Sequence, residues 1–350
     1  MTAAPERPLT RPQQLADNGL IGPAAVAPLT AVTEQFGMAV TPAMAALIDP
    51  DDPDDPIARQ FLPAVAELQT GPLDVSDPIG DATHSPLPGI VHRYPDRVLL
   101  LPLRVCPVYC RFCFRRETVG SNEPEVLGDH DLDAALEYIA EDNSIWEVIL
   151  SGGDPLILSP RRLRNIMDAL DAISHVQVIR IHTRVPVVDP IRITAELTAA
   201  LDCNKPVYVV LHTNHSRELT PAAIQSCGQL RRAGIGLLSQ SVLLRGINDD
   251  AVVLESLFRK LVANGIKPYY LHHADRTPGT AHFRTTVAEG QRLMRELRGR
   301  VSGLCLPEYV LDIPGGHGKT PLDEGWVSQA GDRLNVTDYQ GKQHFYSETE

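Results

Sequence analysis

The 350-residue chain lacks several features that would place it in particular protein classes. It has no run of about 18 or more apolar residues, so a membrane-spanning helix is not expected. It holds only six cysteines, too few for a disulfide scaffold. Its 32 Lys and Arg are outnumbered by 44 Asp and Glu, and a net charge of −12 gives no bulk attraction for nucleic acid. Residues 1–11 contain no apolar core of a secretory signal. We therefore predict a cytoplasmic protein that binds neither membrane nor nucleic acid.

The N-terminal region differs in composition from the rest of the chain. Residues 1–90 are rich in Ala and Pro, with helical patches at 25–36 and 57–68. Between the patches, residues 49–56 form the run DPDDPDDP, which we interpret as a solvated, stiff linker. We expect a helical N-terminal layer rather than a separate catalytic unit.

From residue 97 onward, nearly continuous apolar runs recur, and most of them are spaced by about 30 residues, the size of one βα unit. Such runs are typical of parallel strands that are buried on both faces. The six runs are 97–105, 146–150, 176–182, 207–212, 235–244 and 266–272. The pattern predicts an α/β fold, either a doubly wound sheet or a barrel-like sheet. In both architectures, functional sites lie at the carboxyl ends of the strands.

Helical patterns fill the intervals between the predicted strands. Ser159 and Pro160 provide an N-cap and a first turn. Asp249 or Asp250 can cap the next clear helix. After Ser159 and Pro160, apolar residues recur at positions i, i+3, i+4 and i+7: Leu163, Ile166, Met167 and Leu170. The segment therefore predicts an amphipathic helix.

Three cysteines follow the first predicted strand in the segment 106–113, CPVYCRFC. This is C-x3-C-x2-C, with Cys106, Cys110 and Cys113 as candidate ligands. A zinc site would require a fourth protein ligand, and no fourth Cys or His lies close in sequence to these three cysteines. Three thiolates suit a [4Fe–4S] cluster with one iron open to a small molecule. The other cysteines are expected as small apolar residues of the fold; they are Cys203, Cys227 and Cys305.

This cysteine segment resembles that of the radical S-adenosylmethionine (SAM) enzymes, in which the open iron binds SAM. The second predicted strand is followed by SGGDP at 151–155, which resembles the glycine-rich segment of that superfamily. The resemblance implies that Gly152, Gly153 and Asp154 contact SAM. It also implies a partial (βα)6 barrel.

Residues 312–321, DIPGGHGKTP, form a glycine-rich loop that ends in a lysine. A phosphate-binding P-loop is excluded because Ile313 stands at the first glycine position and Pro321 follows where a helix would open. The loop resembles the C-terminal loop of the lysine 2,3-aminomutase family, whose lysine carries pyridoxal phosphate (PLP). The resemblance extends over residues 92–342. Its motifs include HRYPDR at 92–97, CRFCFRR at 110–116, QSVLLRGIN at 240–248 and HFRT at 282–285.

The family resemblance implies an isomerase that interconverts L-lysine and β-lysine by a 2,3-amino shift. Its cofactors would be a [4Fe–4S] cluster, SAM and PLP, with an electron donor for the cluster. Lys319 would be the catalytic, PLP-bearing lysine, and we expect it to be desolvated, which favours a neutral amine.

The family's binding residues also have counterparts here. Arg115 matches the partner of the substrate α-carboxylate, where a bidentate fork is suited to a carboxylate. Asp275 and Asp312 match the pair that holds the lysine side-chain ammonium. The resemblance places four further residues at cofactor positions: Arg93 and Arg97 at the PLP phosphate, and His212 and Gln240 facing SAM.

The chain also departs from the family pattern. Longer relatives bind a structural zinc through a C-terminal cysteine cluster and one internal cysteine, whose position here is Asp250; we therefore expect no zinc. We divide the chain into a helical region (1–90), a radical SAM core (91–285) and a C-terminal PLP-lysine segment (286–350).

The sequence alone leaves several functions open besides the 2,3-amino shift of free lysine. The compact length resembles enzymes that make β-lysine for elongation factor P. The chain could also be a radical SAM aminomutase for another amino acid, a PLP-free radical SAM enzyme or a non-catalytic Fe–S protein. Product stereochemistry, the reductant and a homo-oligomeric state are left undetermined by the sequence.

Overall fold

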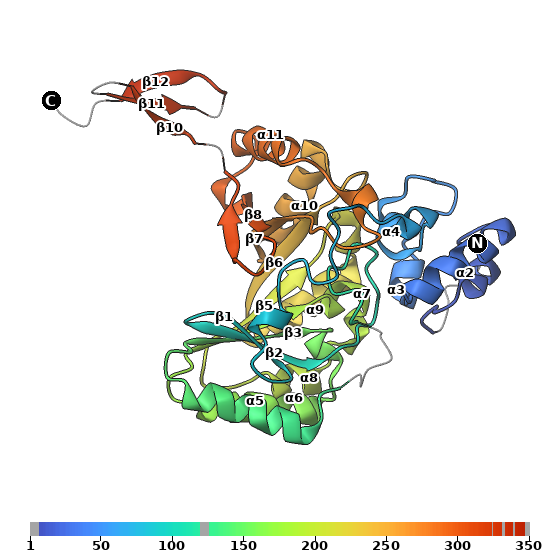
Figure 1. Ribbon diagram of the computed structural model, residues 1–350, viewed down its shortest axis with the longest axis vertical. Helices are drawn as coiled ribbons and strands as arrows, with labels where there is room; N and C mark the ends of the chain where they lie inside the picture. Colours follow the sequence, from blue (N-terminus) through green and yellow to red (C-terminus); the bar gives the residue numbers. More distant parts are fainter. Residues whose placement is uncertain (1–6, 120–125, 324, 331–332, 339, 347–350) are drawn as a thin grey trace.

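In the computed structural model, described for residues 7–119, 126–323, 325–330, 333–338 and 340–346, the main sheet has nine strands that pair in the order of the sequence. The six apolar runs form parallel strands, which confirms the sequence prediction. These are β2 (Arg97–Leu103), β3 (Glu147–Gly152), β4 (Val178–Thr183), β5 (Val207–His212), β6 (Gly236–Leu243) and β7 (Lys267–His273). Together with their helices they form the expected partial barrel (Figure 1).

Three further strands extend this sheet beyond the six predicted ones. β8 (Glu308–Asp312) continues it in parallel after β7. The edges are antiparallel: β1 (Ile90–Tyr94) pairs with β2, and β9 (Lys319–Pro321) pairs with β8. The Lys319 backbone N–H donates to the Tyr94 hydroxyl at 2.7 Å, so the two edges of the curled sheet are bridged by a side chain.

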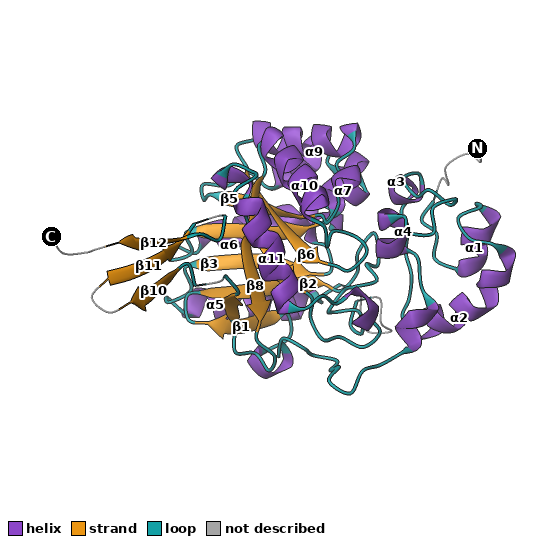
Figure 2. Cartoon of the chain, turned by 90° about the horizontal axis from the view of Figure 1, so that it is seen from above, coloured by secondary structure: helices purple, strands orange, loops and turns teal. Residues whose placement is uncertain are grey.

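Helices that connect the strands cover the outer face of this sheet (Figures 1 and 2). Their apolar faces are buried, as the 3.6-residue periodicity predicts. They are α5 (Asp129–Glu141), α6 (Pro160–Ala172), α7 (Val185–Val188), α8 (Ala195–Ala200), α9 (Pro221–Arg232), α10 (Ala251–Ala263) and α11 (Val287–Arg298). Ser159 caps α6 by accepting from Arg162 N, and Asp250 caps α10 by accepting from Val252 N at 2.8 Å.

The predicted N-terminal layer consists of short helices beside the barrel: α1 (Pro12–Asp17), α2 (Val26–Gln35), α3 (Pro42–Ala45) and α4 (Pro56–Phe61). The interpretation of 49–56 as a solvated linker is wrong at its end. Asp55 is fully buried, accepts from Ile57 N and Ala58 N to cap α4, and pairs with Arg217 at 2.6 Å. A carboxylate with several donors can be buried, and composition alone does not reveal those donors.

A second, three-stranded antiparallel sheet follows the barrel, made of β10 (Val327–Ala330), β11 (Arg333–Thr337) and β12 (Gln343–Tyr346). In both views it projects from the barrel on the side away from the N-terminal helices (Figures 1 and 2). One hydrophobic cluster extends from Leu9 to Tyr309, so the N-terminal layer and the barrel share a core. Among the described residues, no helix combines the length and apolarity that crossing a bilayer requires.

Candidate active site

The cysteine loop begins directly after β2 and places its three thiols around one small cavity. Cys106, Cys110 and Cys113 all line this space of about 40 Å³. Burial raises the pKa of Cys113 to about 11, and burial together with Asp154 raises that of Cys106. Both shifts favour the protonated thiol, and a bound metal would favour the thiolate instead.

This arrangement fits a polynuclear cluster. Within the described parts of the chain, no three His, Cys, Asp or Glu side chains converge on a point where a single metal ion could bind. A cubane instead distributes its thiolates over several irons, so its ligands surround a volume. The residues that line the cavity include no fourth Cys, His, Asp or Glu. Three thiolates would therefore leave one iron without a protein ligand.

Buried arginines fix the loop to the N-terminal layer. Glu67 is fully buried and accepts from Arg111 Nη2 at 2.6 Å and from Arg116. Arg111 also donates to the carbonyl of Gly37 at 2.8 Å. One carboxylate of the N-terminal layer thus holds the arginines at two positions of the cysteine segment.

A third buried arginine contacts one of the cysteines directly. Arg184, which follows β4, donates through Nη1 to Cys110 Sγ at 2.8 Å and through Nη2 to Gln60 and Glu218 at 2.8 and 2.6 Å. Burial acts to lower the pKa of Arg184, but the charges of Cys110 and Glu218 raise it overall, so the guanidinium is charged. The sequence analysis missed Arg184 although it directly follows a predicted strand, where the strand-end rule applies.

The glycine pair at the end of β3, Gly152 and Gly153, packs against the backbone that leads into Cys106. A Cβ at Gly153 would meet the Val105 carbonyl oxygen at 2.0 Å, and Gly152 has φ +98°, so both positions require glycine. Asp154 accepts four hydrogen bonds, from Thr183 Oγ1 and from backbone N–H groups after β3 and β4. Its carboxylate is thus engaged within the protein, and the cofactor contact of these three residues stays a prediction.

Lys319 lies at the end of a glycine-rich hairpin between β8 and β9. Gly315, Gly316 and Gly318 all have positive φ, and Ile313 N donates to the Gly318 carbonyl at 2.8 Å. Pairing of the two strands sets Lys319 opposite Asp312, and Lys319 Nζ lies 2.6 Å from Asp312 Oδ1. The expectation of a desolvated lysine is wrong in this structure, because the side chain is 30% exposed and ion-paired.

Asp312 and Asp275 form the acidic part of the site. Burial acts to raise the pKa of Asp312, but His272 and Lys319 lower it well below its usual range. His272 Nδ1 lies 3.4 Å from Asp312 Oδ2. Burial and the negative charge of Asp312 raise the pKa of Asp275 to about 7, while Lys319 and Arg115 act in the opposite sense. The structure therefore brings the two predicted aspartates into one electrostatic unit.

Of the three predicted anion-binding arginines, Arg93 and Arg115 converge on Asp81, whereas Arg97 pairs with Asp96 at 2.6 Å at the start of β2. Arg115 donates through Nε and Nη2 to Asp81 Oδ2 at 2.9 and 2.7 Å. Arg93 donates through Nη2 to Asp81 Oδ1 at 3.1 Å. Arg97 lies 3.7 Å above the centre of the Tyr94 ring, and the Tyr94 hydroxyl in turn accepts from Lys319 N. Asp81 was not among the predicted residues.

Histidines and a glutamine at strand ends connect the two halves of the site. His212 pairs with Gln240 across β5 and β6, and its ring lies 5.9 Å from that of Phe112 in the cysteine segment. Burial, Arg184 and His272 lower the pKa of His212 well below its usual range. Its Nε2 is buried without a hydrogen-bond partner, which leaves a neutral imidazole available to a ligand.

His182, at the end of β4, resembles His212 in its burial and lowered pKa, and the sequence analysis did not identify it. Its Nε2 is also buried without a partner. Burial, Arg180 and Lys319 lower its pKa well below the usual range. His182 and His272 are both polar residues at the carboxyl ends of strands. The strand-end rule could have identified them from the sequence, but we applied it only to the other strands.

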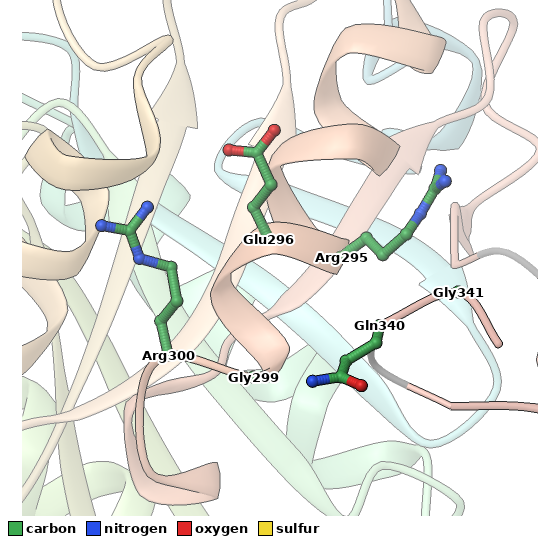
Figure 3. A pocket seen from close by; sticks show the side chains of 6 residues that line it. All are labelled: Arg295, Glu296, Gly299, Arg300, Gln340 and Gly341. Atoms are coloured by element: carbon green, nitrogen blue, oxygen red, sulfur yellow. The ribbon is translucent and has the colours of Figure 1, made fainter.

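Another cavity, of about 370 Å³, lies between the end of α11 and the C-terminal sheet (Figure 3). The residues that line it are Arg295, Glu296, Gly299, Arg300, Gln340 and Gly341. It contains none of the residues predicted for the site and is open to solvent, so it is not the candidate active site.

Two family models match this chain. The radical SAM superfamily matches residues 100–255, which include the three cysteines, and the lysine-2,3-aminomutase family matches residues 294–350, which include Lys319. A radical SAM methyltransferase of known structure from Sphaerobacter thermophilus is similar at a TM-score of 0.43 and 20% identity, over 63% of this chain and 68% of its own.

Full-length relatives are more similar. The L-lysine 2,3-aminomutase of Clostridium subterminale is 43% identical over 89% of this chain and 75% of its own. That of Fusobacterium nucleatum is 42% identical, over 91% and 75%. A glutamate 2,3-aminomutase from Clostridioides difficile is 37% identical, over 89% and 74%. At these identities and coverages, this chain belongs to the lysine 2,3-aminomutase family of radical SAM enzymes.

Proposed function

We propose that this protein is a lysine 2,3-aminomutase, an isomerase that moves the α-amino group of L-lysine to the neighbouring carbon to give β-lysine. The observation that carries the proposal is the ion pair between Lys319 Nζ and Asp312, with Asp275 beside it. The Lys319 ammonium is held there beside two carboxyl groups, and the side-chain ammonium of a lysine substrate would be held in the same way. Arg115 lies close enough to influence Asp275 and is suited to the carboxylate of the same substrate.

The residues present fit the three cofactors of this reaction. When bound, the cluster and SAM supply the radical that removes hydrogen, and PLP stabilises the migrating nitrogen. Cys106, Cys110 and Cys113 would hold the cluster, and Lys319 would hold PLP. His212 offers an unpaired imidazole nitrogen beside the cysteine segment, where SAM would lie.

The chain's own groups then orient the substrate. Asp312, held ionised by His272 and Lys319, attracts the side-chain ammonium, and Asp275 adds a second carboxyl. Arg115 fixes the opposite end of the amino acid, which places the α and β carbons between the two anchors. Such two-point binding restricts rotation and supplies orientation.

The charge of the site favours lysine over glutamate. A glutamate side chain would bring a third carboxylate to Asp275 and Asp312, and like charges in a partly buried site repel strongly. A role in elongation factor P modification would use the same site, and no feature of the described residues favours it over free lysine.

We infer a cytoplasmic enzyme that receives electrons from a one-electron donor. All six cysteines are unpaired, which suits a reducing compartment, and a cluster of this kind must be reduced before it can act on SAM.

The test is product analysis under anaerobic conditions. Protein reconstituted with iron, sulfide and PLP is incubated with L-lysine, SAM and dithionite, and amino acids are separated by chromatography. We expect β-lysine from wild type and none from Lys319→Ala. A fully iron-loaded protein that retains no stoichiometric PLP after chemical assay, or that converts another amino acid and not lysine, would overturn the proposal.

A further inference from the structure

Asp81 lies between Arg115 and Arg93, which we expect to bind the substrate carboxylate and the cofactor phosphate. Its Oδ2 accepts from Arg115 Nε and Nη2, and its Oδ1 accepts from Arg93 Nη2. All three side chains are mostly shielded, with 18%, 15% and 10% of Asp81, Arg115 and Arg93 exposed. One carboxylate therefore orients two guanidinium groups that belong to different segments of the chain.

The backbone of Asp81 is itself anchored. Its N–H donates to Asp77 Oδ1 at 2.8 Å, and its carbonyl accepts from Ser85 Oγ at 2.8 Å. The preceding Gly80 packs on the lysine hairpin: a Cβ there would lie 2.7 Å from Gly316 N. His84 Nε2 lies 3.1 Å from the Gly316 carbonyl oxygen. The turn that carries Asp81 is thus braced against the loop that presents Lys319.

The hydrogen bonds of Asp81 leave donors on both arginines. A guanidinium has two edges that can bind a carboxylate or phosphate. Asp81 occupies the Nε–Nη2 edge of Arg115 and leaves the Nη1–Nη2 edge. Arg93 uses Nη2 for Asp81 and for the Ile79 carbonyl at 2.6 Å, and its buried Nε has no partner. Two positive charges share one negative charge, so the trio retains a net positive charge for an anion.

We propose that Asp81 is a positioning carboxylate that orients Arg115 toward the substrate carboxylate and Arg93 toward the cofactor phosphate. The inference rests on the proposed function and adds a residue to it. Asp81 acts through the arginines and does not itself touch substrate. Because both arginines share Asp81, removing its charge affects substrate and cofactor binding together.

Asp81 could instead occupy the position of the substrate carboxylate, and this role predicts a different result. If the Asp81 carboxylate stood where the substrate carboxylate binds, its removal would tighten lysine binding. The anchored backbone of Asp81 argues against such displacement, since the turn would have to leave both Asp77 and the lysine hairpin.

The test compares Asp81→Asn with wild type and with Glu147→Gln. Glu147 forms an arginine pair of similar exposure, with Arg180 at 3.0 Å and 12% and 11% exposed, and it lies at the start of β3, away from the strand ends. Lysine KM and kcat are measured on holoenzyme with matched iron and PLP. The dissociation constant of PLP is measured separately by equilibrium dialysis.

We expect Asp81→Asn to raise the lysine KM and the PLP dissociation constant each by about tenfold, with kcat within about twofold. Glu147→Gln should leave all three unchanged. Asp81→Glu, which keeps the charge but displaces it by one methylene, should show smaller increases and provides the same test if the Asn variant does not fold.

A lysine KM that is lowered or unchanged, or an unchanged PLP affinity, would overturn the inference. The dialysis result does not depend on turnover. If wild type converts no lysine, the proposed function fails, while unchanged PLP affinity in Asp81→Asn would still reject the positioning role.

Discussion

Asp275 and Asp312 carry the same side chain, but their pKa values are displaced in opposite directions. Burial and the charge of Asp312 raise the pKa of Asp275 to about 7. Burial acts on Asp312 as well, but His272 and Lys319 outweigh it and lower the Asp312 pKa. Two carboxyl groups close together do not ionise equally, and the one with the better partners keeps its charge. Asp312 is therefore the permanent anion of the site and Asp275 the group that titrates near neutrality.

The first prediction concerns Asp312→Asn. A substrate ammonium would lose one of two carboxylates in a partly desolvated site, and breaking a buried ion pair costs about 3–5 kcal/mol, so kcat/KM for lysine should fall by about a hundredfold or more. The measurement is lysine kinetics at matched iron and PLP content. Asp338→Asn, which removes an acid paired with His344 in the C-terminal sheet, is the control and should behave as wild type. An unchanged kcat/KM would show that Asp312 only shapes the hairpin.

The second prediction concerns pH. Ammonium binding needs ionised Asp275, and a group with a pKa of about 7 is about one-tenth ionised at pH 6 and nine-tenths at pH 8. Wild-type kcat/KM should therefore rise by up to about tenfold over this range, since that ratio reports groups of the free enzyme. In Asp275→Asn this rise should be absent. A rise of the same size and midpoint in the variant would assign the titration to another group.

The raised pKa of Asp275 also affects stability, and here the effect of rising pH is unfavourable: the free energy of unfolding falls while kcat/KM rises. The folded-state pKa of Asp275 lies above the unfolded value, so the folded state binds the proton more tightly. Its contribution to the free energy of unfolding is present below about pH 4 and is lost as pH rises through about 7. Urea unfolding of the apo protein at about pH 5 and pH 8 should show a larger loss for wild type than for Asp275→Asn.

At the scale of elements, loops and hairpins carry the reactive groups while strands and helices hold them in place. The cysteine loop follows β2 and packs against the glycine pair at the end of β3, where Gly153 has no room for a side chain. The lysine hairpin leaves β8 and is braced by Gly80. Site residues on loops positioned by a rigid scaffold are a common arrangement in enzymes.

The third prediction separates the clustered cysteines from the scattered ones. Alanine at Cys106, Cys110 or Cys113 should abolish SAM cleavage and lower iron content while the apo protein still folds, because these residues lie in a loop. Serine at the buried Cys227 or Cys305 should cost only about 1–2 kcal/mol of stability, with iron retained. The measurements are iron content and thermal unfolding. Full iron and activity in Cys110→Ala would reject the ligand set.

At the scale of the whole molecule, the N-terminal layer supports the cluster site. Glu67 binds Arg111 and Arg116 of the cysteine segment, and Gln60 of α4 binds Arg184, which donates to Cys110. The layer also shares the hydrophobic core of the barrel. The layer is therefore part of the machinery that shapes the cysteine loop.

The fourth prediction follows from this coupling. Glu67→Gln leaves two buried guanidinium groups without their shared carboxylate, and such a change costs about 3–5 kcal/mol. We expect a lower melting temperature together with poor iron retention after reconstitution. Asp54→Asn, which removes an exposed partner of Arg59, should change neither. Normal iron content in a destabilised Glu67→Gln protein would show that the layer stabilises the fold without shaping the loop.

The sequence by itself determined the features that depend on neighbours along the chain. The spacing of Cys106, Cys110 and Cys113, the six apolar runs and the glycine loop before Lys319 are all local patterns. Strand periodicity and turn chemistry act over a few residues, so they can be recognised without knowledge of the fold. The rule that sites lie at the carboxyl ends of parallel strands then placed the cysteine segment at the functional edge of the sheet. The lysine loop follows β8, a strand that the sequence analysis did not predict, so its place in the site rested on the family resemblance alone.

Tertiary structure alone decided which groups serve as partners to those motifs. Glu67 lies 44 residues from Arg111, Asp81 lies 34 from Arg115, and Gln60 lies 124 from Arg184. It also decided that Asp55 is buried and that Lys319 is ion-paired with Asp312. The free energy of a charged group depends on which donors and acceptors surround it after folding, and chain separation carries no information about them.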